Sequence, residues 1–110
     1  MSDKAVVIIS TGETEKALTG LMYAQNAIRF GWLEDVKVIF FGPAQNLVID
    51  NEQVKKAALE IAESEKPMFC RFLSDRDGNS DQLRAIGMNV KYVGPVISDL
   101  LKQGYAPLVF

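Results

Sequence analysis

Residues 5–9 read AVVII, an apolar run with no polar side chain on either face of a strand. Such a strand is typical of the middle of a parallel sheet, where helices cover both faces. Stretches with helical periodicity separate it from four further, largely apolar runs, at residues 36–41, 68–73, 89–93 and 105–110. This alternation predicts a single α/β domain over residues 1–110, a three-layer α/β/α sandwich with a mostly parallel five-stranded sheet.

Cap and breaker residues indicate where these elements begin and end. Ser10 and Glu13 have the spacing of a capping box before the first helix. Asp50 or Asn51 is expected to cap the second helix, because both side chains accept backbone hydrogen bonds. Pro107 lies in the last run and predicts a sheet edge, since proline cannot donate to the ladder.

The composition limits the classes of function. A formal charge of −2 over 110 residues provides no basic surface for nucleic acid or an anionic membrane. The first apolar run is too short for a signal peptide or a membrane span, and one cysteine forms no internal disulfide, so we expect a cytoplasmic protein. Without histidine, a GxGxxG motif or a Walker A lysine, the sequence predicts neither a metal nor a cofactor.

Cys70 is the single cysteine of the chain. Free cysteines are often buried as small hydrophobic residues, and its alternation with Met68 and Phe72 supports that interpretation. Its position near the end of a predicted strand favours another, because ligands bind outside the carboxyl ends of parallel strands. Arg71 and Arg76 would stabilise a thiolate, the nucleophilic form, if they reach it.

Two turns are expected at the same edge as Cys70, one after each of the first two strands. The backbone N–H groups of the first turn would suit an anion, although an ordinary helix cap is the simpler explanation. The turns and the residues at the end of the third strand are predicted to line one pocket, formed by Cys70, Arg71, Ser10, Thr11, Gly12, Gly42 and Pro43.

Two connections are interpreted as loops. Residues 40–50, FFGPAQNLVID, are unusually apolar and would wall a pocket, pack under their own helix or contact another subunit. We favour the subunit contact, because a small domain covers its apolar surface poorly alone. Residues 74–79 are predicted to be a solvated turn before a short helix capped by Ser80 or Asp81, and Asp75 and Asp77 have too few companions for a calcium loop.

The order and spacing of these segments resemble the DsrE/DsrF-like family, the small sulfur-relay proteins that include the TusBCD subunits and YchN. The opening AVVIISTGETEKALTGLMYAQNA, the strand VKVIFFGP, the cysteine of KPMFCRF and the second half DQLRAIGMNVKYVGPVISDLLKQGY with its PLVF ending carry the resemblance. It covers essentially the whole chain. Small residues often follow the family cysteine, whereas Arg71 and Phe72 follow it here.

The resemblance implies an α/β/α fold, assembly into a homotrimer or homohexamer, and a persulfide carried on the cysteine after the third strand. Cys70 matches that cysteine by position, so sulfur transfer between donor and acceptor proteins is the expected function. The alternative is a non-catalytic binding or scaffold subunit in which Cys70 is only packed.

Overall fold

The structure is a computed structural model that describes residues 3–110, and these form one sheet of five parallel strands. The strand order is β4-β3-β2-β1-β5, so the strand that contains the AVVII run has a neighbour on both sides. The predicted α/β class and parallel sheet are confirmed. The strands are β1 Lys4–Ile9, β2 Asp35–Phe40, β3 Met68–Cys70, β4 Asn89–Lys91 and β5 Ala106–Val109.

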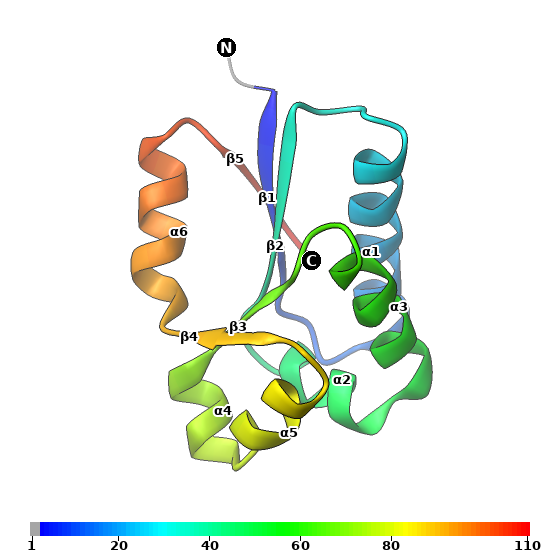
Figure 1. The fold of residues 1–110 in the computed structure, drawn as a ribbon, viewed down its shortest axis with the longest axis vertical. Helices are drawn as coiled ribbons and strands as arrows, with labels where there is room; N and C mark the ends of the chain where they lie inside the picture. The colour runs from blue at the N-terminus through cyan, green and yellow to red at the C-terminus, as the bar shows by residue number, and fades with distance from the viewer. Residues whose placement is uncertain (1–2) are drawn as a thin grey trace.

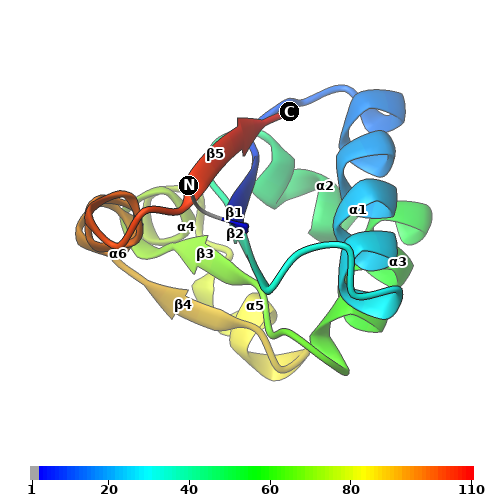
Figure 2. The ribbon, with the colours of Figure 1, turned by 90° about the horizontal axis from the view of Figure 1, so that it is seen from above.

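Helices cover both faces of this sheet. They are α1 Thr14–Arg29, α2 Ala44–Asp50, α3 Glu52–Ala62, α4 Arg71–Asp77, α5 Ser80–Ala85 and α6 Val93–Lys102. Helices α1 and α3 lie on one side of the strands and α6 on the other (Figures 1 and 2). Helices α2, α4 and α5 gather at the end where the strands finish (Figure 1). The arrangement is the expected three-layer sandwich.

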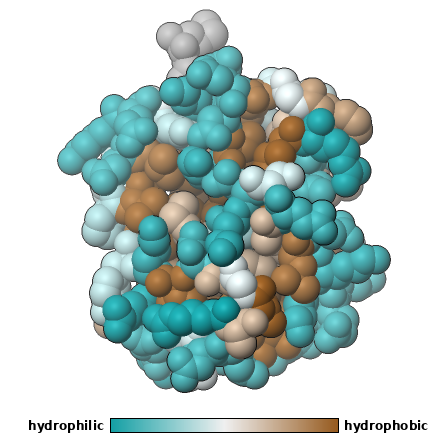
Figure 3. Space-filling model, viewed as in Figure 1, coloured by the Kyte–Doolittle hydropathy of each residue, from teal (hydrophilic) through white to brown (hydrophobic). Residues whose placement is uncertain are grey.

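Side-chain alternation along the strands produces two apolar cores. Val7, Ile9 and Phe40 point toward α1 and α3, where the rings of Phe40 and Phe69 stack with centroids 4.5 Å apart. The neighbouring residues, including Val6 and Cys70, point toward α6. The second core is smaller because α6 is the main helix on its side. On the side of the β4 edge, brown hydrophobic side chains show through the middle of the surface, while teal ones cover most of its rim (Figure 3).

The apolar segment 40–50 is not the loop that the sequence predicts, because residues 44–50 form α2. Val48 is fully buried, and Leu47 and Ile49 pack against the larger core. Most apolar side chains of this segment are therefore used within the chain, whereas Phe41 is 40% exposed, and the expected subunit contact stays a prediction. The sequence did not predict this helix because Gly42 and Pro43 are also typical of a turn.

The predicted third strand, residues 68–73, ends early at Cys70, and residues 71–77 form α4. The turn expected at residues 74–79 is thus mostly helical, and Gly78 closes α4 in the left-handed region with φ of 74°. Phe72 lies on this helix and is 65% exposed. It does not alternate with Cys70 on a strand, as the sequence suggested.

The cap predictions are confirmed in one place and wrong in another. Asn51 caps α3, because its side chain accepts the N–H of Val54 at 3.0 Å. The capping box of Ser10 and Glu13 does not form. Instead Thr11 Oγ1 accepts the N–H of Glu13 at 3.0 Å, and α1 begins at the next residue.

Pro107 lies on an edge strand, as predicted, since β5 pairs only with β1. Phe110 directs both backbone groups to β1: its N–H donates to Ile8, and its oxygen accepts from Ser10. Backbone direction alternates along a strand, so Pro107 faces the open edge, where a missing N–H breaks no bond in the sheet. A proline there also hinders another strand from pairing with this edge.

A polar cluster lies at the opposite, amino-terminal edge of the sheet. Tyr105, which is 8% exposed, donates a hydrogen bond to Asp35 Oδ2. This hydrogen bond is the main reason that the pKa of Tyr105 rises from 10.0 to about 12. Burial lowers the pKa of Lys37, but the carboxylates of Glu65 and Asp35, 3.3 and 3.6 Å away, outweigh it and raise that pKa overall.

We expect alkaline pH to weaken the fold partly through Tyr105. Its pKa is higher in the folded chain, so the contribution is complete below pH 10.0 and is lost as pH rises toward about 12. Urea unfolding of the wild type across this range should show a steeper loss of stability than Tyr105→Phe. Lys37 is present in both proteins, and identical slopes would contradict the assignment to Tyr105.

Candidate functional site

The carboxyl ends of three strands lie side by side at one edge of the sheet. Ile9 pairs with Phe40, and Phe40 pairs with Phe69, so β1, β2 and β3 finish nearly in line. The chain segments that follow them, residues 10–12, 42–43 and 70–71, therefore leave the sheet at the same edge. These segments contain all the residues that the sequence assigned to one site.

The first two of these segments are in direct contact. The N–H of Ala44 donates to the backbone oxygen of Ser10 at 3.3 Å. Gly42 has φ of 128°, and a Cβ there would lie 2.8 Å from Ser10 Oγ. A Cβ on Gly12 would lie 3.1 Å from Cβ of Pro43. Both glycines are required by this close approach, and Gly42 also by its backbone conformation.

A buried amide joins the second segment to the third. Gln45 is 2% exposed and lies on the first turn of α2. Its Oε1 accepts the N–H of Gly42 at 3.3 Å, and its Nε2 donates to the backbone oxygen of Cys70 at 3.1 Å. Gln45 thus fixes the backbone at the end of β3 relative to the end of β2. The signal in the sequence is a pair of amides, Gln45 and Asn46, within the apolar run 40–50.

The first segment offers little to an anion. The N–H groups of Ser10 and Thr11 both donate to the backbone oxygen of Phe110, at 2.7 and 3.1 Å. The ring of Phe110 lies against α1, where it fills the space in which Gly20 lacks a side chain. The N–H groups of Ser10 and Thr11 are therefore occupied within the chain.

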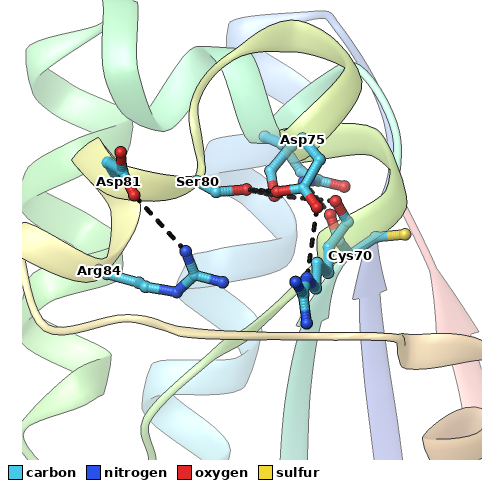
Figure 4. Close-up of polar contacts among 8 residues, drawn as sticks. Cys70, Asp75, Ser80, Asp81 and Arg84 are labelled. Atoms are coloured by element: carbon cyan, nitrogen blue, oxygen red, sulfur yellow. Dashed lines mark hydrogen bonds and ion pairs between the residues drawn. The ribbon is translucent and has the colours of Figure 1, made fainter.

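Cys70 is the last residue of β3 and directly precedes α4. Its side chain is 6% exposed and belongs to the apolar cluster under α6, with Val6, Ile8, Ile39 and Val93. Its sulfur points away from the polar side chains of Asp75, Ser80 and Arg84 (Figure 4). The backbone of Cys70 thus joins the turns at the edge, while the thiol faces the core beneath α6.

The two arginines expected near the thiol are mainly engaged elsewhere. Arg71 binds Asp75 at 3.3 Å and lies 5.4 Å from the centre of the Tyr92 ring, at cation–π distance. The pKa of Arg76 is raised, first by its hydrogen bond to Asp77 and least by the charge of Cys70. Arg76 is bound to Asp77 at 3.0 Å, so neither arginine is directed to the thiol alone.

Sequence reasoning missed a group of hydroxyls between α4 and α5. Ser74 and Ser80 are buried, and their Oγ atoms lie 2.6 Å apart. Ser80 donates to Asp75, and this hydrogen bond is the largest cause of the lowered pKa of that carboxyl. A hollow of about 270 Å³ lies beside them, lined by Ser74, Asp75, Gly78, Ser80, Asp81 and Arg84. Figure 4 shows the dashed contacts of this group.

Hydrogen bonds within the chain account for this hydroxyl group. Ser74 also contacts the backbone oxygen of Arg71 at 3.3 Å, so the cluster holds α4 against α5. Asp75 and Asp77 point to separate arginines, and residues 3–110 contain no cluster of three or more acidic or cysteine side chains fit for a metal. Over the same residues, no helix is long and apolar enough to cross a membrane.

Comparison with known proteins places the fold but no activity. No family model matches the sequence, and no curated protein matches it significantly. The solved structure of BT1422 from Bacteroides thetaiotaomicron, a conserved protein of unknown function, is similar, with a TM-score of 0.86. The match covers 98% of this chain and 96% of that one at 23% identity. It shows a shared fold over nearly the whole chain.

Replacing Gln45 with Met should destabilise the fold. Met fills a similar volume but leaves the Gly42 N–H and the Cys70 carbonyl without their partner. A buried group left so costs about 1–3 kcal/mol, and the part-buried Gly42 N–H costs less than the buried Cys70 carbonyl. Urea unfolding should therefore show a loss of about 2–4 kcal/mol. Gln53→Met, on the exposed face of α3, is the control and should change stability by less than about 0.5 kcal/mol. Equal effects of the two changes would contradict the role of Gln45.

Proposed function

We propose that this protein is a DsrE-like sulfur carrier in which Cys70 holds a persulfide. The observation that carries the proposal is the position of the chain's single thiol, at the last residue of β3 and at the edge where three strands end. Ligands bind outside this edge in open parallel sheets. The parallel α/β sheet with β3 ending at the cysteine also agrees with the family resemblance of the sequence.

The transfer step needs no oxidant. The Cys70 thiolate attacks the terminal sulfur of a donor persulfide, R–S–SH; the donor S–S bond breaks and a new one forms on Cys70. The bonding electron pair leaves with the donor as R–S⁻, and the product is Cys70–S–SH. A second thiolate then removes that sulfur by the same exchange. The chain has one cysteine, so the second thiol belongs to another molecule.

The proposal includes the cellular setting and the partners. A persulfide carrier requires a reducing compartment, so the protein acts in the cytoplasm, between a donor and an acceptor protein. By its family resemblance it works as a homotrimer or homohexamer. With a net charge of −2, it acts on neither nucleic acid nor an anionic membrane.

A second candidate has an observation of its own. Cys70 is only 6% exposed and lies among aliphatic side chains under α6, as a structural cysteine does. In this case the protein is a binding or scaffold subunit that performs no sulfur chemistry. The two candidates differ in whether a reagent reaches the thiol of the folded chain.

Incubation of the native protein with a persulfurated donor or polysulfide should add one sulfur, about 32 Da, to the intact mass. A reductant should remove the addition, and Cys70→Ala should prevent it. The thiol reaches its partner through local opening at the start of α6, so alkylation should be slower in the folded chain than in urea but still measurable.

Failure of both reactions in the folded chain, with rapid alkylation after unfolding, would support the scaffold subunit instead. Cys70→Ser supplies an independent check of burial. A hydroxyl left unpaired in this apolar cluster costs about 1–3 kcal/mol of stability, whereas a thiol that already meets solvent would be replaced without loss.

A further inference from the structure

The exposed face of α3 carries a row of charged side chains. A second copy of this row, turned end to end, would place opposite charges against each other. Glu52, Lys56, Leu59 and Glu63 follow one another at spacings of four, three and four residues, so they lie on one side of the helix. They line a shallow hollow of about 550 Å³. Leu59, at the centre, is 38% exposed. The outline of the molecule on the α3 side is mainly teal (Figure 3).

The charge at the end of α3 is unfavourable for an isolated helix. Glu63 is the C-cap residue, beside the negative end of the helix dipole, and the last turn contains no basic side chain. Within residues 3–110, neither Lys56 nor Glu63 takes part in an ion pair. Glu52 and Glu60 lie four residues from Lys56 on the same helix without an ion pair in the described residues, so Lys56 and Glu63 are each available to a charge from another chain.

We propose that a second copy of this chain docks here, with the two α3 helices antiparallel and related by a two-fold axis near Leu59. Lys56 and Glu63 lie about 4.5 and 6 Å from Leu59 along the helix axis, in opposite directions. The two-fold operation therefore brings Lys56 of one copy to Glu63 of the other, twice per pair. A parallel arrangement would instead oppose like charges, which is unfavourable.

An apolar contact accompanies the two ion pairs. Leu59, 38% exposed, meets its symmetry equivalent at the axis. The face presents one apolar side chain among charged and polar ones, whereas charged residues are depleted at the core of stable interfaces. The pair should therefore be weak, with a dissociation constant in the micromolar range, and it should weaken further at high salt.

This inference deepens the assembly proposed above and does not depend on the thiol chemistry. A two-fold contact is absent from a simple trimer but is present in a dimer and in a hexamer built from three such pairs. It is a different surface from residues 40–50, for which the sequence suggested a subunit contact and where Val48 is buried while Leu47 and Ile49 pack against the larger core.

Charge reversal tests the contact by sedimentation velocity over micromolar concentrations. Lys56→Glu and Glu63→Lys should each weaken association by about tenfold or more, because each places two like-charged pairs at the axis. An equimolar mixture of the two variants, and the double variant Lys56→Glu/Glu63→Lys, should restore it. Lys102→Glu, on α6 at the other side of the sheet, is the matched control and should leave association unchanged.

The outcomes separate the two proposals. A monomeric wild type at high concentration would overturn both the contact and the assembly. A trimer, or an oligomer that neither reversal disturbs, would overturn the α3 contact alone. Sulfur loading of Cys70 is measured on the same variants. If these exposed charges serve only association, circular dichroism should show that the variants fold normally.

Discussion

The amide of Gln45 determines how the carboxyl edge of this sheet is built. Parallel strands lose their ladder partners where they end, and the backbone groups left there must be paired or reach water. Gln45 pairs two of them, one in the turn after β2 and one at the end of β3. Gly42, in the same turn, packs closely against Ser10. The ends of β1, β2 and β3 are therefore held together.

This constraint fixes the direction of the Cys70 side chain. Once its carbonyl is bound to Gln45 and Phe69 is stacked on Phe40, strand alternation turns the thiol toward α6. The backbone of Cys70 thus lies at the edge of the sheet, and its side chain lies in the core. Any chemistry at this sulfur requires that the cover formed by α6 and α4 opens locally, a motion available to short helices held by few buried side chains.

The sequence was sufficient to predict the parallel sheet, because each strand has its own apolar run and each long helix its own period. It was insufficient for α2 and α4, which have seven residues each. Gly42 and Pro43 before α2, and the polar residues after Leu73 in α4, resembled turns. The site residues were brought to one edge by topology alone. Their contacts depend on pairs distant in sequence, such as Gln45 with Cys70, 25 residues apart, which no local pattern reveals.

The proposed pairing surface and the proposed sulfur carrier lie on opposite faces of the sheet. Helix α3 lies on the α1 side, whereas Cys70 faces α6 on the opposite side. Two copies joined through α3 therefore turn their thiols away from each other, and a sulfur atom does not pass directly between the Cys70 residues of such a pair. Since each chain holds one cysteine, the acceptor for a persulfide on a paired molecule is a thiol from outside the pair. Pairing through α3 leaves the α6 side of both copies open to it.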